Sequence, residues 1–138
     1  MPEKIKVALV GLGNCFSGLI QGIEYYSKNP SQKVTGIIHE NLRDYTIHDI
    51  DFVAGFVVGA NKVGKPINEA IYELPNMVNW IEKNDMPKAN GTVHESPALD
   101  GVGIWVENKV KPIESEKSES ELRAVSYTHL TLPTTPYV

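Results

Sequence analysis

Two glycines near the start of the chain have the spacing of a turn that binds a phosphate group. The apolar run Val7–Val10 ends at Gly11-Leu12-Gly13, and a segment of helical periodicity follows directly. One glycine would allow the tight turn, and the other would let the backbone approach a pyrophosphate at the positive end of the helix. The pattern therefore predicts a nucleotide-binding turn. The competing interpretation is a strand-to-helix turn that merely needs glycines, because Phe16 stands where a third glycine or an alanine is usual.

The elements that would hold this turn alternate between strands and helices. Val7–Val10 is too continuous for a strand with one solvent face, so it predicts a strand buried on both faces of a parallel sheet. Asp51–Val58 is the best second buried strand, and Val34–Glu40 is either a short extended run or a surface excursion. We therefore expect an α/β fold, a Rossmann-like parallel sheet with flanking helices.

Apolar spacing also predicts the helices and their packing faces. The first helix, starting near Asn14, is expected to pack through Phe16, Leu19, Ile20 and Ile23. A second is expected to begin at Pro66, to pack through Ile67, Ala70, Ile71 and Leu74, and to end at Pro75. Met77–Ile81 suggests a further short helix, and Thr92–Glu95 a short strand. Ser118 and Glu121 match a capping box that would start another helix.

Composition indicates one globular domain. The chain has 138 residues, of which 41% are hydrophobic and 22% charged. The net charge of -4 does not indicate a basic surface that would bind nucleic acid or an anionic membrane, and no apolar stretch could span a bilayer. The single cysteine, Cys15, fits a reducing cytoplasm, and the four histidines lack metal-ligand spacing. We therefore expect a cytoplasmic protein without a nucleic-acid partner, a membrane partner or a metal site.

Residues around the glycine turn resemble a known family. The segment GLGNCFSGLIQGIEYY, Gly11–Tyr26, is similar to the GxGNCxSxLxxGxxYY opening of the bacterial and archaeal inositol-3-phosphate synthases, also called myo-inositol-1-phosphate synthases. The similarity continues through Ile37–Phe56 and Ala60–Ile71, and returns at His94–Gly103, with order and spacing kept. GNC followed by two adjacent tyrosines is far more distinctive than the glycines alone.

The resemblance implies a cofactor and a set of residues that bind it. The cofactor is NAD, and the expected cofactor-binding residues are Gly11, Gly13, Asn14, Cys15, Phe16 and Ser17. The implied reaction converts D-glucose 6-phosphate into 1D-myo-inositol 3-phosphate by NAD-dependent oxidation, intramolecular aldol cyclisation and reduction, a step of inositol and phospholipid biosynthesis. The family's catalytic lysines lie on a second domain, beyond residue 124, so no catalytic residue is assigned and the chain alone is expected to be inactive. Full-length relatives are commonly homotetramers.

The chain departs from the family at the position expected to bind the adenosine ribose. Most relatives carry an aspartate where this chain has Val57, and a second one where it has Gly59. Because valine cannot accept hydrogen bonds from the ribose hydroxyls, NAD affinity or cofactor choice is expected to change. Glu40, roughly 20 or slightly more residues after the glycines, is the alternative ribose ligand.

The end of the chain suggests a different origin. Val125–Thr134 reads VSYTHLTLPT, the translation of a DNA sequence that looks like a transposase adapter of sequencing libraries. We therefore expect residues 1–124 to be a partial NAD-binding Rossmann domain, cut short by truncation, and residues 125–138 to be a disordered artefact. Two other functions stay open: the NAD(P)-binding domain of another dehydrogenase, with Glu40 as its ribose acid, and a non-catalytic nucleotide-binding module.

Overall fold

A parallel three-stranded sheet forms the centre of the computed structural model, which describes residues 3–29, 36–89, 91–98, 103–105 and 108–130. The strands are β1 (Ile5–Val10), β2 (Ile50–Val57) and β3 (Thr92–Glu95), in the order β1-β2-β3. Both neighbouring pairs are parallel, and the same strand order occurs in one half of a doubly wound sheet. The predicted α/β class, a parallel sheet with flanking helices, is confirmed.

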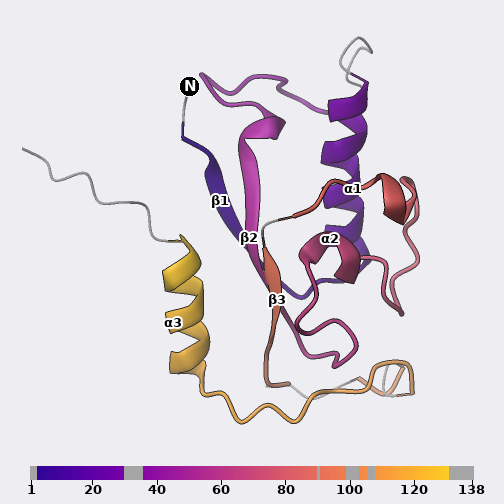
Figure 1. The fold of residues 1–138 in the computed structure, drawn as a ribbon, viewed down its shortest axis with the longest axis vertical. Helices are drawn as coiled ribbons and strands as arrows, with labels where there is room; N and C mark the ends of the chain where they lie inside the picture. The colour runs from indigo at the N-terminus through magenta and orange to yellow at the C-terminus, as the bar shows by residue number, and fades with distance from the viewer. Residues whose placement is uncertain (1–2, 30–35, 90, 99–102, 106–107, 131–138) are drawn as a thin grey trace, which may run out of the picture.

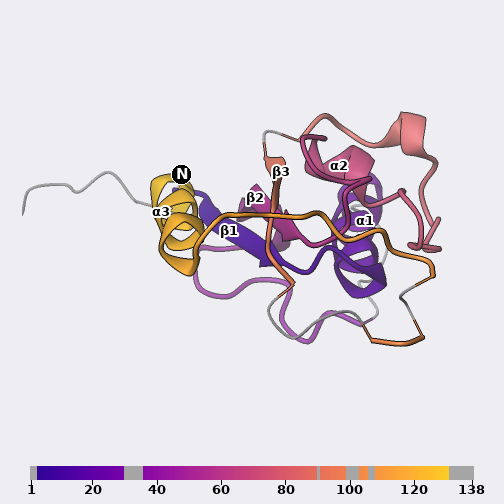
Figure 2. The ribbon, with the colours of Figure 1, turned by 90° about the horizontal axis from the view of Figure 1, so that it is seen from below.

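Helices cover both faces of the sheet. α1 (Asn14–Lys28) and the single turn α2 (Ile67–Ala70) lie on one side, and α3 (Glu119–Leu130) lies on the other (Figures 1 and 2). Two short 3-10 helices, η1 (Ile47–Asp49) and η2 (Lys83–Asp85), interrupt the connecting segments. In the described part of the chain, no helix combines the length and the apolar character needed to cross a membrane.

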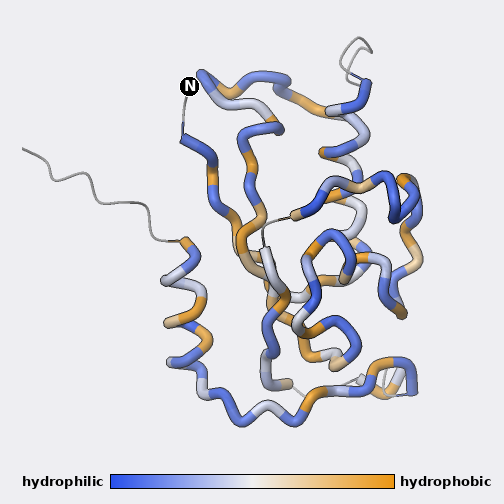
Figure 3. The backbone as a smooth tube through the Cα atoms, in the orientation of Figure 1, coloured by the Kyte–Doolittle hydropathy of each residue, from blue (hydrophilic) through white to orange (hydrophobic). Residues whose placement is uncertain are grey.

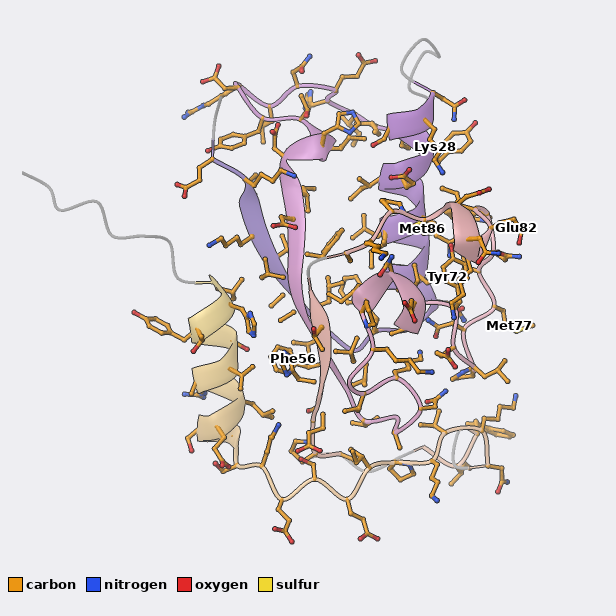
Figure 4. All side chains as sticks on the ribbon, viewed as in Figure 1. Lys28, Phe56, Tyr72, Met77, Glu82 and Met86 are labelled. Atoms are coloured by element: carbon orange, nitrogen blue, oxygen red, sulfur yellow. The ribbon has the colours of Figure 1, made fainter. Side chains whose placement is uncertain are left out.

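A β-bulge in β2 determines which of its side chains face α1. Val7 pairs with Phe52 and Ala8 with Ala54, so Val53 is an extra residue in β2. Side chains an odd number of positions apart normally point to opposite faces of a strand. The extra residue shifts this alternation, so Phe52 and Val57, five positions apart, both pack in the same core. Phe56 lies on the opposite side, where it shares a cavity wall with residues of α3 (Figure 4).

The core lies between the sheet, α1 and α2, and Figure 3 shows the apolar stretches of the strands that contribute to it. Its buried residues are Leu9, Leu12, Ile20, Val57, Ile67, Ala70, Ile71, Ile81, Met86 and Val93. Of the predicted packing face of α1, Ile20 is buried and Phe16 packs against the core, but Leu19 is 46% exposed. Ser17 and Gln21 are buried instead.

The segment after α2 differs from the prediction. Met77–Ile81 forms no helix, and the predicted face of α2 ends before Leu74, which is exposed. The Gln21 side-chain oxygen accepts hydrogen bonds from the backbone N–H groups of Trp80 (2.8 Å) and Ile81 (3.2 Å). These bonds hold the segment in a non-helical path along α1. Residues 36–40 of the possible strand Val34–Glu40 form no strand, and residues 34–35 lie outside the described residues.

The capping box at the start of α3 is confirmed. The Ser118 N–H donates to Glu121 Oε2 at 2.6 Å, and the Glu121 N–H donates to Ser118 Oγ at 3.4 Å. α3 continues past Ala124, so the expectation of disorder from residue 125 is wrong for residues 125–130, which are helical. Residues 131–138 lie outside the described residues. The assignment of an artefact in this tail stays a prediction.

Candidate functional site

The glycine turn connects the carboxyl end of β1 to the start of α1. Gly11 has a φ of +83°, which would strain any other residue, and its N–H donates a 2.9 Å hydrogen bond to the carbonyl of Phe56 in β2. Gly13 is the N-cap residue of α1, and no side chain caps this helix end. The backbone N–H groups of the first turn are therefore available to an anionic ligand.

A cavity of about 260 Å³ opens beside the turn. It is lined by Gly11, Leu12, Gly13, Val57, Val58, Gly59, Asn61, Lys62, Pro75, Asn76 and Val110. The cavity lies at the carboxyl ends of parallel strands, which is where open α/β sheets bind their ligands. An ideal Cβ built on Gly13 would have no heavy atom within 4 Å, so the backbone is open to a ligand there. This geometry fits the pyrophosphate of a dinucleotide.

A buried lysine fixes the middle of the turn. Lys62 is only 6% exposed, and its Nζ donates 2.8 Å hydrogen bonds to the carbonyl of Leu12 and to Asn76 Oδ1. Asn76 in turn donates through Nδ2 to the carbonyl of Ile71 at 2.9 Å. Burial lowers the pKa of Lys62 below its usual value, although the charge of Glu73 acts in the opposite direction. Sequence reasoning missed both Lys62 and Asn76, whose role depends on a contact between distant segments.

The turn brings four of the predicted cofactor residues to the surface. Gly11 and Gly13 line the cavity. Asn14 and Cys15 are exposed in the first turn of α1, where Asn14 Oδ1 accepts a 2.7 Å hydrogen bond from the Met77 N–H and Cys15 is a free thiol. Among the described residues no group of three or more His, Cys, Asp and Glu side chains could hold a metal ion.

The other two predicted residues have side chains directed into the protein. Phe16 packs against the hydrophobic core. Ser17 is fully buried, and its hydroxyl donates to the carbonyl of Ile71 at 3.1 Å. The backbone N–H of Ser17 already donates to the carbonyl of Gly13 at 3.0 Å, so of these two residues only Phe16 has a backbone N–H left for a ligand. The side chains of both residues hold α1 in place. Cofactor contact by the predicted set stays a prediction.

The chain is similar in sequence to enzymes of one family, although no protein-family model matches it. It is 38% identical to the inositol-3-phosphate synthase of Mycolicibacterium smegmatis over 114 residues, which are 82% of this chain and 31% of that protein. It is 43% identical to the inositol-3-phosphate synthase of Corynebacterium glutamicum over 100 residues, 72% of this chain and 27% of that protein. The chain belongs to the inositol-3-phosphate synthase family. It spans less than a third of the length of these relatives.

Solved structures agree with this membership in the inositol-3-phosphate synthase family. A myo-inositol-1-phosphate synthase-related protein from Thermotoga maritima aligns with a TM-score of 0.63, covering 93% of this chain and 32% of that chain. At 21% identity this similarity shows the fold alone. The crystal structure of Ari2 aligns with a TM-score of 0.59 at 31% identity, covering 69% of this chain and 30% of that chain. The resemblance stated from the motif residues is confirmed.

Val57 and Glu40 occupy the two candidate positions for binding the adenosine ribose in this member of the inositol-3-phosphate synthase family. Only Val57 lies at the cavity. Val57 ends β2 and lines the cavity, at 6% exposure. Glu40 lies in an exposed loop with Tyr26, near the end of α1, which is at the opposite edge of the sheet from the glycine turn (Figure 1). Glu40 therefore does not line the cavity beside the glycine turn, and its role as ribose ligand of another dehydrogenase stays a prediction. None of the described residues lining the cavity is an acid.

Proposed function

We propose that the chain is the NAD-binding part of an inositol-3-phosphate synthase. The observation that carries this proposal is the uncapped start of α1, with Gly13 open beside a cavity at the carboxyl edge of the sheet. Membership in the family supports NAD as the ligand. Bound NAD would supply the acceptance and return of a hydride, with D-glucose 6-phosphate as substrate and 1D-myo-inositol 3-phosphate as product.

The chain's own residues would bind and orient the cofactor. Gly11 and Gly13 allow close approach of the backbone, and the N–H groups of the first turn of α1 would donate to the pyrophosphate. Lys62 holds the carbonyl of Leu12 and so fixes the shape of the turn. A homotetramer in the cytoplasm is part of the same proposal, and the free thiol of Cys15 supports a reducing compartment.

Calorimetric titration of the chain with NAD tests cofactor binding. The variant is Gly13→Asp, and Gly13→Asn is its uncharged control. We expect the wild type to bind NAD and Gly13→Asp to bind it at least about tenfold more weakly, because the carboxylate would meet the pyrophosphate. The variant should fold, since the space at Gly13 is open and Asp is a favourable N-cap residue. A wild type that does not bind NAD, or a Gly13→Asp variant that binds it equally well, would overturn the proposal.

Glucose 6-phosphate with NAD tests the expectation about catalysis. The resemblance places the catalytic lysines on a second domain, so we expect NAD binding without formation of inositol phosphate by this chain alone. Inositol phosphate released by the purified chain would contradict that expectation, and would mean that this chain itself carries the catalytic groups.

A further inference from the structure

The end of β2 lacks the group that normally discriminates between the two nicotinamide dinucleotides. In dinucleotide-binding sheets an acid near the end of the second strand accepts hydrogen bonds from the ribose 2′-hydroxyl, and a nearby basic residue accommodates a 2′-phosphate. Val57 is the last residue of β2 and lines the cavity. Among the described residues of the cavity wall, none carries a carboxylate that would repel a 2′-phosphate.

The same cavity wall holds a buried lysine that forms no ion pair with the described residues. Lys62 is 6% exposed, and no carboxylate of the described residues lies within ion-pair distance of its Nζ. Two of its three N–H donors bind the carbonyl of Leu12 and Asn76 Oδ1, so one donor is left for a ligand. A buried charge is costly unless it is paired, and a phosphate in the cavity would pair it.

Two acids close to residues of the cavity wall form ion pairs with other lysines. Glu73 accepts an ion pair from Lys65 at 2.9 Å and a longer one from Lys83 at 3.7 Å. Glu95, which pairs with Val57 across β2 and β3, forms a 3.3 Å ion pair with Lys117. Each of these two carboxylates is therefore paired with a cation, and neither lines the cavity.

We propose that this cavity accepts a dinucleotide with a phosphorylated 2′ position, so that NADP binds at least as tightly as NAD. Val57 removes the hydrogen-bond acceptor that would favour NAD, and Lys62 supplies the positive charge that a second phosphate needs. The inference rests on the proposed function, because it assigns the nucleotide class that the same site takes.

Parallel calorimetric titrations of the wild-type chain with NAD and NADP, at one fixed ionic strength, test the inference. We expect an NADP dissociation constant equal to or below that of NAD. Val57→Asp should reverse the preference, with a change in the ratio of the two constants of at least about tenfold. Lys62→Met should weaken NADP more than NAD, whereas Lys88→Met, an exposed lysine outside the cavity, should leave the ratio unchanged.

The outcomes separate this inference from the proposed function. NAD bound at least about tenfold more tightly than NADP by the wild type would overturn the inference and leave NAD binding intact. Binding of neither dinucleotide would overturn the proposed function itself. Circular dichroism melts verify that each variant folds. Because Val57 is buried, Val57→Asp is the variant most at risk of not folding. The ratio of the NAD and NADP dissociation constants of the wild type decides the inference without it.

Discussion

The Ser17 hydroxyl donates a 3.1 Å hydrogen bond to the backbone carbonyl of Ile71. Ser17 lies in the first turn of α1 and Ile71 directly follows α2, so this bond joins the helix of the cofactor turn to the segment after α2. One turn later, the Gln21 amide donates to Ser17 Oγ at 3.0 Å and to the carbonyl of Val78 at 2.9 Å. Buried polar contacts therefore hold the start of α1 against the segment that follows α2.

Replacing Ser17 by alanine should destabilise the fold. The change removes a donor to Ile71 and an acceptor for Gln21, so we expect the free energy of unfolding to fall by about 1–2 kcal/mol. Ser27→Ala is the matched control on the same helix, where the serine is exposed and the effect should stay within about 0.5 kcal/mol. Urea denaturation followed by circular dichroism measures both, and equal effects of the two variants would refute the role assigned to Ser17.

Gly91 and Gly22 should respond to alanine with opposite signs. A Cβ on Gly91 would lie 2.6 Å from Ile67 Cδ1 and 2.9 Å from the backbone carbonyl carbon of Val53, so we expect a loss of about 1–3 kcal/mol from overpacking. A Cβ on Gly22 would meet nothing within 4 Å in the middle of α1, and alanine should stabilise the protein by about 0.5–1 kcal/mol. Thermal melts of the two variants measure the difference, and a stabilised Gly91→Ala would show that β2 and Ile67 pack otherwise.

Local sequence predicted the elements whose cause is local. The apolar run before Gly11 gave β1 and the turn, Thr92–Glu95 gave β3, and Ser118 with Glu121 gave the start of α3. The path of Met77–Ile81 could not be predicted in this way, because a distant side chain, Gln21, binds its backbone.

The candidate site shows the same division between local and distant causes. Gly11 and Gly13 were found from their spacing alone, since the turn is formed by consecutive residues. Lys62 was missed, because its hydrogen bond joins it to Leu12 across 50 residues. The inward direction of Ser17 also depends on a distant partner, the carbonyl of Ile71.

Asn76→Ala should weaken both the fold and the cofactor turn. The variant removes one of two hydrogen bonds to the buried ammonium of Lys62, and a bond to a charged group contributes about 1.5–3 kcal/mol, so a loss of that size is expected. NAD affinity should fall as well, because Lys62 then holds the carbonyl of Leu12 less firmly. Asn84→Ala, at an exposed position, is the control for both the urea denaturation and the NAD titration. Unchanged stability of Asn76→Ala would show that Lys62 does not depend on this amide.

Stability should decrease as the pH falls through the titration range of His94. Burial, then the charges of His129 and Lys117, lower the pKa of His94 below its usual value of 6.5, and its Nε2 is buried without a hydrogen-bond partner among the described residues. Between the lowered folded pKa and 6.5 the unfolded chain binds more protons than the folded one. The free energy of unfolding therefore falls as the pH drops through that window.

Melting temperatures measured between about pH 7 and pH 5 check this dependence on the titration of His94. The rings of His94 and His129 lie 5.3 Å apart between centroids, so protonation of His94 places a positive charge at the contact between β3 and α3. His94→Gln should remove most of the slope, and His129→Gln should reduce it because one repelling charge is lost. His39→Gln, in the exposed loop at the far edge of the sheet, should leave the slope as in the wild type. A slope that persists in His94→Gln would assign the acid sensitivity to another group.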